Sequence, residues 1–105
     1  MATLTATLDT GPRNPDFHKG IITGSFDTTD NEGSGNGTTA VDQIVLLPTT
    51  CVIASFVASC EDGAGTLRAE ANKNSADTDT NGTVKIESNC IGNQTFRFVA
   101  TFFGS

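Results

Sequence analysis

The sequence predicts an all-β protein: an antiparallel β-sandwich or small barrel of about seven strands, of jelly-roll or Ig-like type. Segments in which apolar and polar residues alternate recur at short spacing, and turn-forming residues separate them. The composition, with 11 Gly, 7 Phe and neither Trp nor Tyr, favours strands and turns over helices. A chain of 105 residues suffices for one domain, so we expect a single β domain over residues 1–105.

The N-terminal part supplies two strands and two irregular segments. We expect strands at residues 3–8 and 19–26, separated by an irregular crossing in which Pro12 and Pro15 interrupt the pattern. Residues 27–39, DTTDNEGSGNGTT, contain almost no apolar side chain and are rich in glycine. This segment therefore predicts a long, exposed and mobile loop.

Two middle segments, residues 41–47 and 51–60, are apolar at both even and odd positions. A strand of this kind is buried on both faces. We therefore expect central strands of a sheet, or strands that a neighbouring subunit covers.

The C-terminal part alternates regularly. Residues 66–71, 83–88 and 95–102 each place apolar side chains at one parity and mainly polar ones at the other, where Val99 stands with Thr95, Arg97 and Thr101. The residues around Gly63 are expected to turn the chain before Thr66. The apolar set of each strand faces one side, so a single core should contain the following residues: Leu67, Val84, Ile86, Phe96, Phe98 and Phe102.

The stretch DTDTNG places side-chain oxygens at Asp77, Asp79 and Asn81, as the start of an EF-hand calcium loop does. The twelfth position of such a loop holds a bidentate Glu, but here it is Ser88, and Glu87 comes one position early. A calcium turn of another kind remains an alternative. We expect a hairpin turn in which Asn81 and the following glycine adopt positive φ, with no metal and no cofactor bound.

The tripeptide Asp9-Thr10-Gly11 resembles that of retroviral-type aspartic proteases, and Ile91-Gly92 faintly resembles their later apolar-Gly element. That resemblance implies that two copies of Asp9 meet across a dimer and share one proton. A proline and an arginine follow the tripeptide, where the family has apolar or small residues. We expect Asp9 to mark the end of a strand, and we expect no catalytic residue.

His18 is the single histidine, and no Ser or Cys lies close to it in the sequence. An exposed loop position is expected for it rather than a catalytic role. The chain contains no phosphate-binding loop, dinucleotide fingerprint, paired zinc ligands or nucleophile elbow. We therefore expect a protein that is not an enzyme.

The three cysteines are Cys51, Cys60 and Cys90, an odd number without CxxC spacing. Cys51 and Cys60 lie an odd number of residues apart, so on one regular strand they face opposite sides and cannot pair without a bulge. Buried free thiols are the simple expectation. The alternative is a cysteine at a subunit contact that oxidises after assembly.

The net charge of −6 gives a negative field that repels nucleic acid and anionic lipid, so we expect neither as a partner. No basic region precedes an apolar run at the N-terminus, and no apolar stretch has the length of a membrane span. Synthesis in a cytoplasm is the expectation.

Residues 40–104 resemble, in style, the small β-sandwich structural proteins of tailed bacteriophages, such as capsid decoration and head or tail accessory proteins. The segments that carry this resemblance are IVLLPTTCVIASFVAS, the hairpin GTLRAEAN to NGTVKIESN, and FRFVATFFG. The resemblance implies a virion component made in the host cytoplasm. It also implies partners that are copies of the chain itself, often as a trimer, or the major capsid protein and other virion proteins.

A second hypothesis is a surface-binding or adhesion module of β-sandwich fold. Such modules usually stack sugars on exposed Trp or Tyr, which this chain lacks, although an exposed Phe could serve. The aspartic protease ranks third.

Overall fold

The computed structural model describes residues 2–10, 19–28, 40–61, 63, 65–89 and 93–104. These residues contain no helix, and none of them forms a helix that could span a membrane. They form the following eight strands: β1 (Ala2–Leu4), β2 (Thr7–Thr10), β3 (Lys19–Asp27), β4 (Ala40–Val45), β5 (Cys51–Cys60), β6 (Thr66–Lys73), β7 (Asp79–Asn89) and β8 (Thr95–Gly104).

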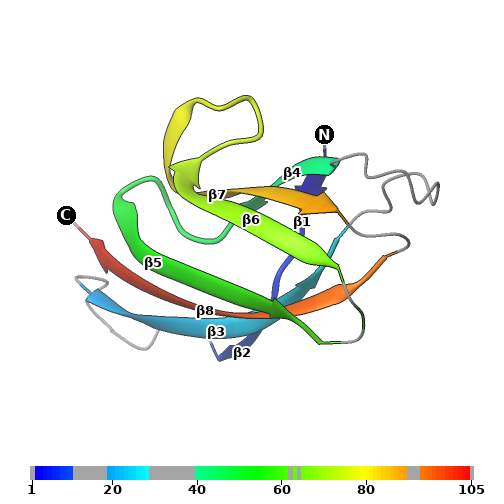
Figure 1. Ribbon diagram of the computed structural model, residues 1–105. Helices are drawn as coiled ribbons and strands as arrows, with labels where there is room; N and C mark the ends of the chain where they lie inside the picture. Colours follow the sequence, from blue (N-terminus) through cyan, green and yellow to red (C-terminus); the bar gives the residue numbers. More distant parts are fainter. Residues whose placement is uncertain are drawn as a thin grey trace.

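The strands build two four-stranded sheets that pack face to face, so the predicted sandwich is confirmed (Figure 1). Sheet I has the order β1-β4-β7-β6, and sheet II has the order β2-β3-β8-β5. All pairs are antiparallel except β1 with β4, which is parallel.

Along the described strands the chain changes sheet at five connections: β1–β2, β3–β4, β4–β5, β5–β6 and β7–β8. Strands β7 and β8 are both inner strands, because β7 pairs with β4 and β6 while β8 pairs with β3 and β5. The C-terminal strand is therefore the inner strand on which much of sheet II is assembled.

The core lies between the sheets, and the residues predicted for it are confirmed. Phe96, Phe98 and Phe102 are 2% exposed, Val84 and Ile86 are fully buried, and Leu67 packs against them from a partly buried position. The rings form a cluster in which Phe26 stacks on Phe96 and Phe56 stacks on Phe98, with centroid distances of 5.7 and 5.3 Å.

The prediction of one strand over residues 3–8 is wrong. Residues 2–4 join sheet I, and residues 7–10 join sheet II. The chain crosses between the sheets at Thr5 and Ala6, where Leu4 and Ala6 both pack against the core. A segment that closes one side of a sandwich must reach both sheets, and a single straight strand cannot.

The two strands that are apolar at both parities have different places. β4 is an inner strand of sheet I, as expected, but β5 is an edge strand of sheet II. The register of β5 against β8 shifts between Ile53 and Ser55. This bulge inserts one residue, so the inward-facing side chains are Cys51 and Ile53 before it and Phe56 after it.

The hairpin between β6 and β7 is confirmed, but its turn comes earlier than predicted. Asn74 organises it, because its side-chain Oδ1 accepts hydrogen bonds from the N–H groups of Ala76 and Thr78, both at 3.0 Å. Gly82 lies within β7 and has a φ of 83°. Its carbonyl accepts hydrogen bonds from the N–H groups of Leu46 and Leu47, and a Cβ at this position would collide with the backbone of residue 47.

The predicted loop over residues 27–39 is too long at its start. Asp27 is the last residue of β3, and Thr28 is 2% exposed, with its Oγ1 donating to the carbonyl of Gln94 at 3.2 Å. Residues 29–39 lie outside the described residues.

Asn72 connects the two edge strands β5 and β6 across the sandwich. Its Oδ1 accepts from the N–H of Ile53 at 3.0 Å, and its Nδ2 donates to the carbonyl of Ile53 at 2.9 Å. The same Oδ1 lies 3.3 Å from the N–H of Gly82. Asn72 sits at a register shift of β6 with a φ of 62°, a conformation that Asn tolerates well.

Candidate functional site

The outer face of sheet II exposes large apolar side chains. Val57 of β5 is 69% exposed, Phe103 of β8 is 49% exposed, and Ile21 of β3 and Val99 of β8 are each 44% exposed. These four residues, with the hydroxyl-bearing neighbours named next, are called the apolar face below. A contiguous group of exposed apolar side chains is typical of an interaction surface.

Strand register brings these residues together from distant parts of the chain. Val99 lies opposite Val57 on one side and opposite Thr23 on the other. One step along the strands, Thr101 lies opposite Ser55 and Ile21, and the two hydroxyl oxygens of Thr101 and Ser55 are 2.6 Å apart. The hydroxyl groups thus bond to each other within the face, and the face carries no charge along these two rows.

Charge begins at the next row, where Arg97 forms a rim with two acids. Its Nη1 lies 3.0 Å from Asp9 Oδ2, and its Nε lies 3.2 Å from Glu61 Oε1. Thr23 Oγ1 also donates to Asp9 at 3.1 Å. The hydrogen bonds from Arg97 and Thr23 lower the pKa of Asp9, and the two acids raise the pKa of Arg97.

This geometry assigns Asp9 a role that differs from the protease resemblance. A proton shared between two aspartates requires two close carboxylates, whereas Asp9 is paired with a guanidinium that favours its charged form. Asp9 is the second-to-last residue of β2, at the point where the register of β2 against β3 shifts between Leu8 and Thr10. Gly11, His18 and the Ile91-Gly92 element lie outside the described residues.

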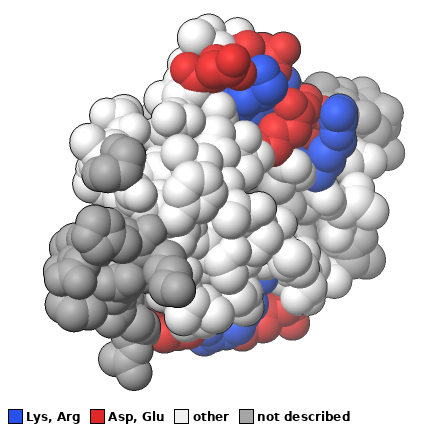
Figure 2. Space-filling model, turned by 90° about the vertical axis from the view of Figure 1, so that its left-hand side faces the viewer, with Lys and Arg blue, Asp and Glu red and all other residues white. Residues whose placement is uncertain are grey.

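The outer face of sheet I is charged, in contrast to the apolar face. Arg68 pairs with Glu70 and Glu87 at 3.3 and 3.6 Å, and Lys85 pairs with Glu87 at 3.2 Å. Figure 2 views the sandwich from one end and shows the charged side chains in two groups, at the top and bottom of the view, with uncharged surface between them. The lower group lies on the side of sheet II (Figure 1 and Figure 2), so both outer faces carry charge, and on sheet II the Arg97 ion pairs border the apolar face.

The carboxylates of the DTDTNG stretch bind lysines. Asp77 Oδ1 lies 3.2 Å from Lys85 Nζ, and Asp79 Oδ1 lies 2.9 Å from Lys73 Nζ. The hydrogen bond to Asp79 raises the pKa of Lys73, and the hydrogen bonds to Glu87 and Asp77 raise the pKa of Lys85. Within the described part of the chain, no group of three or more His, Cys, Asp or Glu is placed to hold a metal ion.

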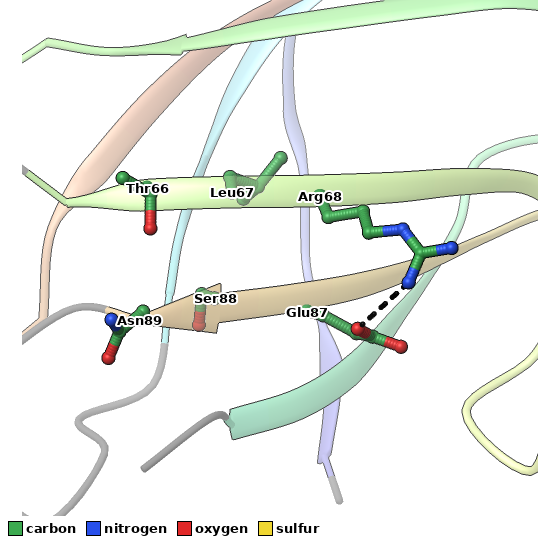
Figure 3. A pocket seen from close by; sticks show the side chains of 6 residues that line it. All are labelled: Thr66, Leu67, Arg68, Glu87, Ser88 and Asn89. Atoms are coloured by element: carbon green, nitrogen blue, oxygen red, sulfur yellow. Dashed lines mark ion pairs between the residues drawn. The ribbon is translucent and has the colours of Figure 1, made fainter. Parts of the chain in front are cut away.

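A shallow notch lies at the end of the β6–β7 pair (Figure 3). Arg68 and Glu87 form its charged side, and Ser88 lies at its base beside Leu67. The Oγ of Ser88 is buried and makes no hydrogen bond to the described residues. Arg68 and Glu87 form an ion pair across the notch, so their charged groups bind each other.

The cysteine prediction is half right. Cys51 and Cys60 are free, but the bulge in β5 turns both toward the core, where opposite faces had been expected. They lie at opposite ends of a ten-residue strand, roughly 30 Å apart, which excludes a disulfide between them. Cys90 lies outside the described residues.

Sequence reasoning anticipated part of the apolar face and missed the rest. The double-parity apolar pattern of residues 51–60 indicated that β5 would need cover on both faces. Val99 and Phe103 also break the alternation of their strand, because apolar residues stand where polar ones are expected. These two apolar residues are the feature of the sequence from which the apolar face could have been predicted.

Comparison with known protein families, curated proteins and solved structures finds no significant match to this chain.

Proposed function

We propose that the protein is a non-catalytic structural component that acts by assembly, with the apolar face of sheet II packed against a second copy of the chain. The observation that supports this proposal is the exposure of Ile21, Val57, Val99 and Phe103 on the outer face of sheet II, where the rows through Val99 and Thr101 contain no charged residue. Burying such side chains against a partner stabilises the complex by about 25 cal/mol per Å² of apolar area.

The size of the face is sufficient for a specific contact. The four-residue β2 and the three strands of nine or ten residues, about 4.8 Å apart, present roughly 540 Å² on each copy, so a face-to-face pair would bury roughly 1,100 Å² in total. This value is at the lower end of specific interfaces. The rim supports a like partner, because it carries both charge signs and a two-fold axis could bring Arg97 of each copy near the acids of the other.

The larger body on which the assembly acts is proposed to be a viral shell. The motivation is the resemblance of residues 40–104 to the small structural proteins of tailed bacteriophages. On this proposal the protein is a capsid decoration or head–tail accessory protein that binds copies of itself, the major capsid protein, or both, and turns over no substrate.

The proposal is tested by pairing two matched substitutions. Val99→Lys places a charge in the centre of the apolar face, and Val45→Lys places the same charge on a valine that is 59% exposed on β4 of sheet I. Both variants should fold, since both side chains are exposed. Face-dependent assembly, measured by analytical ultracentrifugation and by co-sedimentation with capsids, should be lost in Val99→Lys and retained in Val45→Lys.

The proposal is wrong if Val99→Lys and the wild-type chain associate with copies and capsids to the same extent. It is equally wrong if neither associates with anything at high micromolar concentration.

A second candidate function is a surface-binding or adhesion module, which one observation favours. The ring of Phe103 is half exposed on the same face of β8 as Thr101, and an exposed ring of this kind could stack on a sugar ring. Glycan-array binding that Phe103→Ser abolishes, in a chain that remains monomeric, would favour this function over assembly.

A further inference from the structure

Strand β5 is an edge strand whose second half, from Ser55 to Cys60, is unprotected against pairing. Its whole sequence, CVIASFVASC, contains no charged residue, no proline and no glycine, and its bulge lies before this half, between Ile53 and Ser55. An edge strand presents unpaired N–H and C=O groups, and natural proteins block such edges with charges, bulges, prolines or short strands.

The other three edges each show one of these devices. β1 is three residues long, and β2 is four residues long with a register shift beside the charged Asp9. β6 carries Arg68, Glu70 and Lys73 and has a register shift at its end. These features disfavour pairing with a strand from another molecule at these three edges.

The free part of the β5 edge can be located from its hydrogen bonds. Asn72 already binds both backbone groups of Ile53, which covers the first part of the edge. At the far end, the N–H of Glu61 donates to the carbonyl of Thr95 on β8 at 2.8 Å. Because antiparallel pairs alternate, the backbone groups that point away from β8 belong to the following residues: Phe56, Ala58 and Cys60.

The side chains beside this free edge are also apolar and only partly covered. Phe56, Ala58 and Cys60 of β5 and Leu67, Ala69 and Ala71 of β6 are partly buried against the core. Figure 1 shows β5 and β6 on the same side of the sandwich, where the two sheets end. A strand added at β5 would gain main-chain hydrogen bonds and cover these side chains at once.

We infer that β5 pairs with β5 of a second copy, antiparallel and centred on Ala58, so that two four-stranded sheets join into one of eight strands. A second copy is the fitting occupant because its own β5 is the one long edge it can offer, and a two-fold pairing places an uncharged strand against itself. This centre joins Phe56 to Cys60 of the other copy and gives about six new hydrogen bonds. The inference deepens the proposed function and rests on its claim of self-association, but it uses the edge and not the apolar face.

The first experiment compares Val99→Lys with the double variant Val99→Lys/Ala58→Pro in the chain of residues 1–105. Ala58→Pro removes an N–H that points away from β8 and blocks edge pairing, and proline is tolerated at such edge positions. Val99→Lys removes packing through the apolar face and leaves the edge contact, so this variant should sediment with a two-chain mass. The double variant Val99→Lys/Ala58→Pro should sediment with a one-chain mass, while circular dichroism shows a folded β protein.

A two-chain mass that survives Ala58→Pro in the Val99→Lys background overturns the inference, and so does a one-chain mass for Val99→Lys alone. Neither result would decide the proposed function, since capsid binding that Val99→Lys abolishes would still support it.

The second experiment tests the register by cross-linking and does not depend on a proline variant that folds. A hydrogen-bonded antiparallel pair has Cα atoms about 5.5 Å apart, which suits a disulfide, so Ala58→Cys should give a covalent dimer under mild oxidation. Ser59→Cys is the matched control, because its two copies would lie about 8 Å apart in this register. Peptide mapping must find the 58–58 bond; a dimer that forms with Ser59→Cys and not with Ala58→Cys overturns the inference.

Discussion

Replacing Asn72 should reveal how strongly one carboxamide holds the two sheets together. Its side chain makes three hydrogen bonds, two to Ile53 and a longer one to Gly82. Each partly buried hydrogen bond contributes about 0.5–1.5 kcal/mol. Asn72→Gly removes these bonds and retains a residue that accepts a φ of 62°, so it should lower the free energy of unfolding by about 2–3 kcal/mol.

Asn72→Ala should cost more than Asn72→Gly, because alanine adds the strain of the left-handed conformation, about 1–2 kcal/mol. Asn72→Asp is a third comparison: its carboxylate can still accept from Ile53 and Gly82 but cannot donate to the Ile53 carbonyl. Its loss should therefore lie below that of the alanine variant.

Urea unfolding followed by circular dichroism measures these differences, with the m-value expected to stay constant. A loss below about 0.5 kcal/mol for Asn72→Gly would refute the reasoning, since it would mean that water replaces the carboxamide without cost. An alanine variant as stable as the glycine variant would refute the argument from backbone strain.

Three further predictions concern the core, the turn and the rim. Phe98→Ala should lower the free energy of unfolding by about 3–5 kcal/mol, measured in urea, because its ring is 2% exposed and contacts two other rings; a loss below half a kcal/mol would contradict the core described above. Millimolar calcium should leave the thermal midpoint unchanged, because Lys73 binds Asp79; a rise that EGTA reverses and Asp79→Ala abolishes would show a metal site. The pKa of Asp9 is lowered from 3.8 by Arg97, so the ion pair stabilises the fold above about pH 3.8 and this contribution disappears as the pH falls through the folded-state pKa; an NMR titration should show a higher pKa for Asp9 in Arg97→Gln than in the wild type.

The alternation of apolar residues determined the fold class and most of the core. Side chains project to alternate faces of any extended strand, so parity alone placed Val84, Ile86 and the core phenylalanines on one side. This information is local, and it holds wherever the strand is not interrupted. The hairpin of β6 and β7 could likewise be predicted, because turn residues lie between two alternating segments.

Only the tertiary structure decided what depends on one strand meeting another. The bulge in β5 reverses the parity of every residue after it, so the common facing of Cys51 and Cys60 could not be found by counting. Strand order decided that β5 is an edge strand. The arrangement of the strands also brought Asp9 into contact with Arg97, which lies 88 residues later in the sequence. The apolar face, its charged rim and the free edge are products of register between distant segments, and register is set by long-range packing that no single stretch of sequence contains.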